Sequence, residues 1–218
     1  IEMKTEADWK LLENSYEVFI LDFAKIAAAI NADILCIGTE LEKFVKNRPK
    51  YWEALIVKIR AIYKGKLTYA ANWDEFKRVP FWKSLDYIGV DAYFPLSDKK
   101  TPSVSELEKG WEPHKKEIMR IQKQVNKPVI FTEFGYRSVD YTAKKPWESN
   151  RIKGSVNLVG QHNATLAIHN QFWKEKWFAG GFIWKWFHNH ERSGGEQNNR
   201  FTPQNKPTEW LIKKLYTK

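Results

Sequence analysis

The sequence predicts an α/β fold built on a parallel β-sheet. Amphipathic segments, with apolar residues three and four positions apart, alternate with short apolar runs along the 218 residues. Alternation of this kind is typical of parallel strands that are joined by helical crossovers. Hydrophobic residues make up 43% of the chain, which is enough for one domain with a sizeable core. We therefore expect residues 1–218 to form a single α/β domain.

The first half of the chain is expected to contribute three strands. In residues 8–32, apolar side chains recur at helical spacing, which predicts a long amphipathic helix. The apolar run at residues 33–40 follows and is expected to form a buried strand that ends on Glu40. A second helix is expected over residues 49–63, because apolar side chains recur there on one face, and Gly65 stands where a glycine commonly ends a helix. The other elements expected here are strands over residues 67–73 and 86–93 and a short helix over residues 80–85.

The second half is expected to contribute two more strands. Residues 103–125 predict a long helix, and Pro113 within it can break or kink that helix. Residues 128–133 predict a buried parallel strand, because such strands are apolar along most of their length. Glu133 stands where this strand ends. The other elements expected here are a helix over residues 156–177, a strand over 180–186, a last helix over 207–216, and loops over 137–153 and 188–206.

Aromatic residues are numerous, with 11 tryptophans, 9 tyrosines and 13 phenylalanines. So many rings suit a surface that stacks on flat ligands such as sugars or bases. The net charge of +10 raises nucleic acid as a partner. The lysines are, however, spread along the expected helices instead of gathered in one tract, which favours a solvated basic surface. We therefore expect no nucleic-acid partner, and a nucleic-acid binder is the weakest alternative.

The sequence indicates neither a disulfide framework nor a membrane anchor. The single cysteine, Cys36, lies in an apolar run and is expected to be a small buried hydrophobic residue. No stretch approaches the roughly 18 apolar residues of a membrane span, and no signal peptide is evident. Because the chain begins with Ile1, we expect a processed or trimmed start. The compartment stays open, with a bacterial secreted, periplasmic or cell-surface location favoured over a cytoplasmic one.

Two glutamates occupy equivalent positions at strand ends. Glu40 ends the first expected strand and Glu133 ends the fourth. Ligands of parallel α/β proteins bind at the carboxyl ends of the strands, and a carboxylate is costly to bury without a role. Two carboxylates about 5 Å apart across a glycosidic bond suit hydrolysis with retention, one as proton donor and the other as nucleophile. The alternative is that both carboxylates are structural and cap helices or pair with arginines. Glu42 is a second candidate for the role given to Glu40, two residues further along the chain.

Aromatic and polar side chains at the same strand ends are expected to line a substrate site. They are Asn72, Trp73, Asp91, Tyr93, Tyr136, Arg137, Trp184 and Trp186. The hydroxyl of Tyr93 could hold a nucleophile in place, although a core tyrosine is nearly as good an interpretation. Trp184 and Trp186 share one face of the expected strand. Trp184 suits the floor of a sugar site, and Trp186 suits its rim or the core.

The sequence predicts no metal site and no cofactor. His188, His190 and Glu191 lie close together, but the third and fourth partners that a metal site needs are not evident. The glycines lack the spacing of a phosphate-binding or dinucleotide-binding loop. We interpret the histidines as loop residues on a basic surface.

Four motifs, taken in order, resemble strands four, six, seven and eight of a clan A glycoside hydrolase barrel. They are IGTEL at residues 37–41, GVDAYFP at 89–95, IFTEFGY at 130–136 and GFIWKW at 181–186. In particular, the chain resembles glycoside hydrolase family 113, whose characterised members are β-1,4-mannanases. The resemblance implies a retaining hydrolase of β-1,4-linked polysaccharide, mannan in preference to other hexose polymers, with Glu40 as acid/base and Glu133 as nucleophile. Thr39 departs from the pattern, because much of the clan has Asn there.

The resemblance also implies a (β/α)8 barrel of the TIM type, of which only about five β/α units are present. A closed barrel usually needs about 250 residues and eight strands, and a sheet of five strands has two edges with unpaired backbone groups. We expect self-association or a missing N-terminal segment to cover those edges. The alternatives to an active enzyme are a non-catalytic carbohydrate-binding half-barrel and a truncated, inactive hydrolase fragment.

Overall fold

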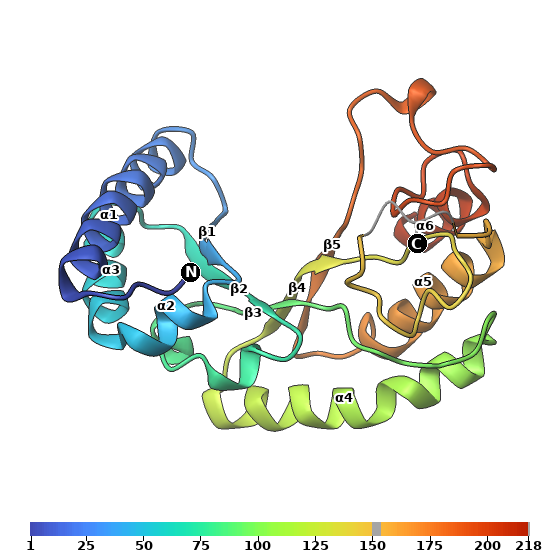
Figure 1. Cartoon of the computed structure of the whole chain (residues 1–218), viewed down its shortest axis with the longest axis horizontal. Coiled ribbons are helices and arrows are strands. Elements are labelled where there is room, and N and C mark those ends of the chain that lie inside the picture. The colour runs from blue at the N-terminus through green and yellow to red at the C-terminus, as the bar shows by residue number, and fades with distance from the viewer. Residues whose placement is uncertain (150–153, 218) are drawn as a thin grey trace. The chain divides into compact units, whose positions relative to one another are not determined.

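The computed structural model describes residues 1–149 and 154–217 of the chain. Within them lies a five-stranded sheet in which the strands follow one another in chain order, β1-β2-β3-β4-β5 (Figure 1). The strands are β1 (Ile34–Thr39), β2 (Lys66–Asn72), β3 (Ile88–Asp91), β4 (Val129–Phe134) and β5 (Phe178–Ile183). The prediction of an α/β fold on a parallel sheet is confirmed.

The helices lie between the strands, as the alternation predicted. They are α1 (Glu6–Ala29), α2 (Glu42–Asn47), α3 (Pro49–Ile62), α4 (Val104–Val125), α5 (Leu158–Phe172) and α6 (Pro207–Tyr216), with short 3-10 turns at Phe76–Arg78, Trp82–Ser84 and His190–Arg192. Helix α4 continues through Pro113 without a break. The loop predicted over residues 137–153 is irregular up to residue 149, and residues 150–153 lie outside the described residues.

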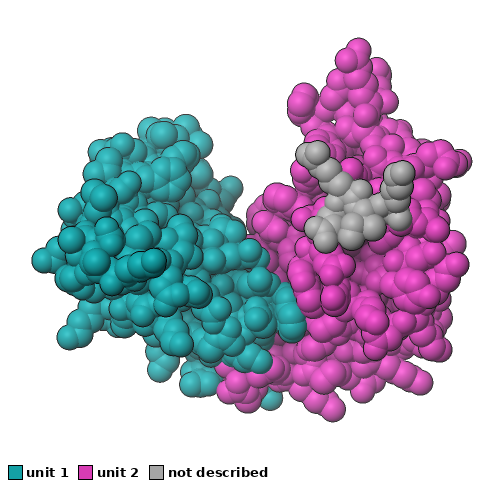
Figure 2. All heavy atoms as spheres, viewed as in Figure 1, with its two compact units in different colours: residues 1–90, 122–130 teal, residues 91–121, 131–218 magenta. Residues whose placement is uncertain are grey.

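The chain divides into two compact units, which Figure 2 shows in different colours. Unit 1 comprises Ile1–Val90 and Gln122–Ile130, and unit 2 comprises Asp91–Ile121 and Phe131–Lys218.

The core of unit 1 is an aromatic cluster around Trp52. The rings of Tyr16, Phe44, Tyr69 and Phe81 all have centroids between 5.3 and 5.7 Å from that of Trp52. Strand β2 is buried along most of its length, and it presents Tyr69 to this cluster. Aromatic side chains thus build this core, although the composition alone suggested a ligand-stacking surface.

Unit 2 has its own aromatic core, built around Phe131 on β4. The Phe131 ring lies 4.8 Å from Phe172 of α5 and 4.8 Å from Phe178 of β5, measured between centroids. Trp111 of α4 lies 5.0 Å from Phe172 and 5.3 Å from Phe94. The burial of Phe131 agrees with the prediction that residues 128–133 form a buried strand.

The two end strands of the sheet are more exposed than the central ones. All of β3 is buried, whereas β1 and β5 have exposed or half-buried side chains. The prediction that Cys36 is buried is wrong: its side chain is exposed, because β1 is the first strand of the sheet and has a neighbour on one side only. Cys36 lies in a groove of about 330 Å³ that α1 and β1 form, lined also by Tyr16, Phe19, Ile20, Phe23, Leu35, Gly38, Thr39 and Leu41.

Strand β5 ends earlier than predicted. It ends at Ile183, so Trp184 and Trp186 lie beyond it and the strand alternation does not govern their directions. The peptide bond between Trp184 and Lys185 is cis. No helix in the described part of the chain is both long enough and apolar enough to span a bilayer.

Candidate active site

Glu133 lies near the carboxyl end of β4, on the strand itself. Its backbone carbonyl accepts a hydrogen bond from the Ala92 amide, 2.7 Å away, which fixes the position of the residue against the segment after β3. Its side chain is half-buried, and its Oε2 atom accepts a 2.8 Å hydrogen bond from the Tyr93 hydroxyl. Burial raises the pKa of this carboxyl, and the bond from Tyr93 opposes that rise only in part. A carboxylate held by one neutral donor in a partly apolar site can act as a nucleophile.

Buried polar contacts support the position of Tyr93. Asp91, the last residue of β3, is fully buried, and its Oδ1 accepts a 2.7 Å hydrogen bond from the Thr132 hydroxyl on β4. The ring of Tyr93 is also buried and meets the ring of Phe201 edge to face, with centroids 6.2 Å apart. Asp91 is therefore placed to join β3 to β4 beneath the site.

Trp184 lies beside the end of β4. Its backbone amide donates to the Phe134 carbonyl over 2.7 Å, and its own carbonyl packs against Gly135 so closely that a Cβ atom at Gly135 would lie 2.1 Å from it. The indole of Trp184 stays partly open to solvent, and the Lys185 ammonium lies 5.5 Å from its ring centroid. The structure thus brings Glu133, Tyr93 and an accessible tryptophan together in unit 2.

Tyr136 and Arg137 are buried, unlike Trp184. The Tyr136 ring has no accessible face for a ligand, and burial raises the pKa of its hydroxyl. Its backbone carbonyl accepts from the Gln161 side chain over 2.9 Å. The Arg137 Nε atom donates to the Asn199 carbonyl over 3.2 Å, and burial, with the nearby charge of Arg200, lowers its pKa. Both side chains are placed to support the loop after β4, so a contact with substrate would have to be indirect.

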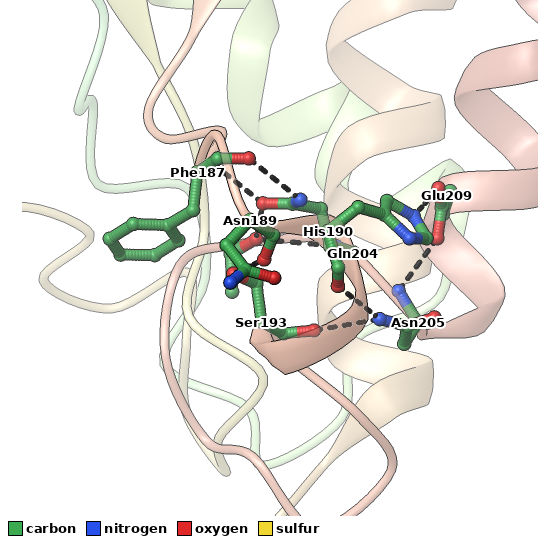
Figure 3. Close-up of polar contacts among 8 residues, drawn as sticks. Phe187, Asn189, His190, Ser193, Gln204, Asn205 and Glu209 are labelled. Atoms are coloured by element: carbon green, nitrogen blue, oxygen red, sulfur yellow. Dashed lines mark hydrogen bonds and ion pairs between the residues drawn. The ribbon is translucent and has the colours of Figure 1, made fainter.

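The loop after β5 carries Trp186 and is held by side-chain amides (Figure 3). Gln204 bonds both the amide and the carbonyl of Phe187, over 2.6 and 3.0 Å, and Asn205 donates to the carbonyls of His190 and Ser193, each over 2.8 Å. A cavity of about 780 Å³ lies between this loop and α6, and Trp186 and Trp210 are among its lining residues.

The predicted loop histidines take no part in a metal cluster among the described residues. The His190 Nε2 atom lies 2.5 Å from a Glu209 carboxylate oxygen, so this histidine joins the loop to α6. Glu209 also accepts from the Asn205 amide over 2.6 Å.

Glu40 follows β1 in unit 1. Its backbone has a φ angle of +51°, in the left-handed region that side chains with a Cβ atom rarely adopt. The Glu40 amide donates to the Ala70 carbonyl over 2.8 Å, and the next amide, that of Leu41, donates to the Tyr69 hydroxyl over 2.6 Å. The Glu40 side chain is exposed. It thus projects from a tightly held turn.

Asn72 is the last residue of β2 and Trp73 follows it, also in unit 1. The Asn72 side chain accepts from the Trp73 amide over 2.8 Å, and the Asn72 amide donates to Glu75 over 3.2 Å. Both residues are half-buried, so part of each side chain is accessible. Glu75 and Tyr69, which hold this end of unit 1, were missed in the sequence. No local signal singles out Glu75, because Asp74 stands beside it between the same two aromatic residues and is exposed.

Comparison with known proteins gives one family and one fold. A family model described as Glycoside Hydrolase Family 113 matches residues 1–206. Among solved structures, the chain is similar to the GH113 β-mannanase AaManA from Alicyclobacillus acidocaldarius in complex with ManMIm, with 23% identity and a TM-score of 0.82 over 96% of this chain and 63% of that one. Another GH113 β-1,4-mannanase has 24% identity and a TM-score of 0.83 over 100% of this chain and 67% of that one.

A more distant neighbour is the β-glucuronidase of Ruminococcus gnavus, with 14% identity and a TM-score of 0.72 over 97% of this chain and 37% of that one. No curated protein matches the chain. The chain spans 63% of the length of the Alicyclobacillus enzyme, so the prediction of a partial (β/α)8-type barrel with five β/α units is confirmed.

Proposed function

Because the chain belongs to glycoside hydrolase family 113, we propose that it hydrolyses a β-1,4-linked polysaccharide, mannan in first place, with retention of anomeric configuration. The observation that carries this proposal is the half-buried Glu133 carboxylate at the end of β4 with the Tyr93 hydroxyl on its Oε2 atom. A retaining hydrolase needs such a carboxylate as its nucleophile. The β-mannanase neighbours support the choice of mannan.

Glu133 would attack the anomeric carbon in the first step. Since Tyr93 engages Oε2, we assign the attack to Oε1, and the hydroxyl keeps the carboxylate from rotating away. Glu40 would protonate the leaving glycosidic oxygen in the same step. In the second step Glu40 would take a proton from water, which then releases the sugar from Glu133.

The remaining predicted residues take roles that follow from their exposure. Trp184 offers an accessible indole beside Glu133 and is our choice for the platform under a sugar ring. Asn72, Trp73 and Trp186, which are partly accessible, would contact more distant sugar units or the rim of the site. Asp91, Tyr136 and Arg137 are buried, and we assign them to supporting the loops instead of binding substrate.

We propose that residues 1–218 act as one domain whose exposed edges are covered in the active form. Apolar side chains are exposed on α1 beside β1, among them Phe19 and Phe23, and at β5, where Phe182 is exposed. Edges of this kind need a partner. The greater length of the family neighbours favours further β/α units, and a second copy of this chain is the other occupant we consider. Sedimentation of the chain tests this: a strictly monomeric, well-behaved species would contradict it.

A mechanism-based fluorosugar, followed by mass spectrometry, tests the hydrolase. A 2-fluoro mannoside with a good leaving group should add one sugar mass to the protein, and the peptide that carries it should contain Glu133. A proton NMR time course should show the β-anomer of the product first, since retention requires two displacements. Label on another peptide would overturn the nucleophile, and an initial α-anomer would overturn retention.

A carbohydrate-binding half-barrel without catalysis remains the second candidate. It is favoured by the partial barrel together with the exposed indoles of Trp184, Trp186 and Trp210. Binding of mannooligosaccharides without release of reducing ends, in the same preparation, would replace the hydrolase by this function.

A further inference from the structure

A buried carboxylate in unit 1 contacts the segment that carries Glu40 through one tyrosine. Glu75 follows β2 and is 2% exposed. Its Oε1 atom accepts a 2.7 Å hydrogen bond from the hydroxyl of Tyr69, which is fully buried. The oxygen of that same hydroxyl accepts the 2.6 Å hydrogen bond from the Leu41 amide. Leu41 directly follows Glu40 in the chain.

The donor and the acceptor of each of these hydrogen bonds can be assigned. The Leu41 amide can only donate, so the Tyr69 oxygen accepts from it and the Tyr69 proton points to Glu75. The second Glu75 oxygen, Oε2, accepts from the Asn72 amide over 3.2 Å. Both carboxylate oxygens therefore act as acceptors, which suits an ionised carboxylate. A carboxylate with these bonds is a stronger acceptor than a neutral group, so it holds Tyr69 in one orientation.

This arrangement fixes the backbone on both sides of Glu40. The Glu40 amide is held by the Ala70 carbonyl, and the Leu41 amide is held by Tyr69. These two amides flank the Cα atom of Glu40, so together they fix its φ and ψ angles. That constraint is needed, because a left-handed φ of +51° is unfavourable for glutamate and persists only where its surroundings hold it. The direction in which the Glu40 side chain leaves the backbone depends on these angles.

We propose that Glu75 is a positioning residue for Glu40, acting through Tyr69. The inference rests on the proposed function, in which Glu40 is the acid/base, and it adds two residues that the family motifs above do not contain. Burial of Glu75 without such a role would be costly, since an ionised carboxylate loses its hydration. Its pKa is raised by burial, and also by the charges of Glu42 and Glu40. Glu42 in turn pairs with Arg78.

The test compares three variants of the full chain: Tyr69→Phe, Glu75→Gln and, as a control, Tyr63→Phe. Tyr63 is equally buried in unit 1, and its hydroxyl donates to the Ala32 carbonyl over 2.6 Å, before the start of β1 and away from Glu40. We expect Tyr69→Phe to lower kcat by about 10- to 100-fold with little change in KM. Glu75→Gln should lower it less, and Tyr63→Phe should leave it unchanged.

The pH profile gives a readout that a merely structural role would not move. Glu40 has to be protonated to act as the acid, so its ionisation sets the alkaline limb of kcat/KM. The charge interaction between Glu75 and Glu40 is mutual. Removing the Glu75 charge should ease ionisation of Glu40 and move the alkaline limb of Glu75→Gln to lower pH. An unmoved limb together with unchanged kcat in both variants would overturn the proposal.

Amide hydrogen exchange at Leu41 tests the same contacts without activity. In Tyr69→Phe this amide should exchange about tenfold or more faster than in the wild type, and in Tyr63→Phe it should not. If the wild type hydrolyses no substrate, the proposed function fails while this measurement still judges the contacts. If the Leu41 amide keeps its protection in Tyr69→Phe, the positioning role is wrong whatever the activity.

Discussion

The ends of β1 and β4 carry the two proposed catalytic glutamates, and they hold them in different ways. At β4, the side chain of Glu133 is itself held, half-buried, by the Tyr93 hydroxyl, and the strand around it is regular. At β1, the contacts we describe hold the backbone of Glu40 in a left-handed turn, and the side chain is exposed. At β4 a carboxylate oxygen is fixed, and at β1 these contacts fix the backbone from which the Glu40 side chain leaves.

Among changes at the ends of β1 and β4, loss of the proposed nucleophile Glu133 should lower turnover the most. Glu133→Gln keeps an acceptor for Tyr93 but removes the nucleophilic charge, so we expect turnover of mannan to fall by about 10⁴-fold or more. The thermal midpoint should stay close to that of the wild type. Glu108→Gln is the control, because Glu108 lies on α4 and bonds only the Asn170 side chain among the contacts described. Substantial residual turnover in Glu133→Gln would reject the assignment.

Loss of the acid/base should have an effect that depends on the leaving group. Glu40→Gln should slow hydrolysis of mannooligosaccharides by about 10²- to 10⁴-fold, because a sugar alkoxide leaves poorly without a proton. An aryl mannoside with an acidic phenol should be affected much less. Glu42→Gln separates the two candidates, since Glu42 pairs with Arg78 instead. If Glu42→Gln shows this dependence and Glu40→Gln does not, the roles have been given to the wrong residue.

Removal of the Tyr93 hydroxyl should act through the nucleophile. The bond from Tyr93 lowers the pKa of Glu133 against the rise that burial causes, so Tyr93→Phe should raise that pKa further. Glu133 works in its ionised form, and the acidic limb of kcat/KM should therefore move to higher pH. At neutral pH we expect about a 10- to 100-fold lower kcat/KM. A limb that stays in place in a well-folded variant would show that Tyr93 is a core residue only.

The smallest effects should come from the glycines at the two strand ends, measured as the free energy of unfolding. A Cβ atom at Gly135 would meet the backbone carbonyl oxygen of Trp184 at 2.1 Å, and a backbone cannot give way easily. A Cβ atom at Gly38 would meet side-chain atoms of Trp52 and Tyr16, both at 2.9 Å, so the overlap is smaller and its nearest atoms belong to side chains. We expect Gly135→Ala to cost about 3 kcal/mol and Gly38→Ala about 1 kcal/mol. Equal costs in urea titrations would contradict this difference between the two ends.

Local sequence predicted the order of the strands and helices correctly, because that order depends on the periodicity of apolar residues. The predicted last helix over residues 207–216 is confirmed at both ends, and the first strand differs by one residue at each end. The fifth strand was placed too late, because the run from Phe178 to Trp184 is apolar and contains no signal for an end at Ile183. Helix α2 at Glu42–Asn47 was missed, since six residues are too few to show a period.

The candidate site was predicted in part. The sequence pointed to Tyr93 as a residue that could hold a nucleophile, and the structure has its hydroxyl on Glu133. Tyr136 was predicted to line the substrate site, and its burial was not predicted. The side chain of a loop residue after a strand can point inward or outward. At Tyr136 the direction depends on the tertiary contacts of Gln161, which bonds the carbonyls of Tyr136 and Phe201.

By itself, the sequence determined the α/β class, the order of the elements and the two strand-end glutamates, because each depends on residues close together in the chain. Only the tertiary structure decided how the rings divide, with Trp52 and Trp111 in cores and Trp184 accessible. It also decided that Cys36 is exposed and that Glu75 reaches Leu41 through Tyr69. The physical reason is that burial and hydrogen bonding depend on neighbours distant in the chain. Local periodicity shows which apolar side chains are candidates for burial, and the tertiary fold determines which of them are buried.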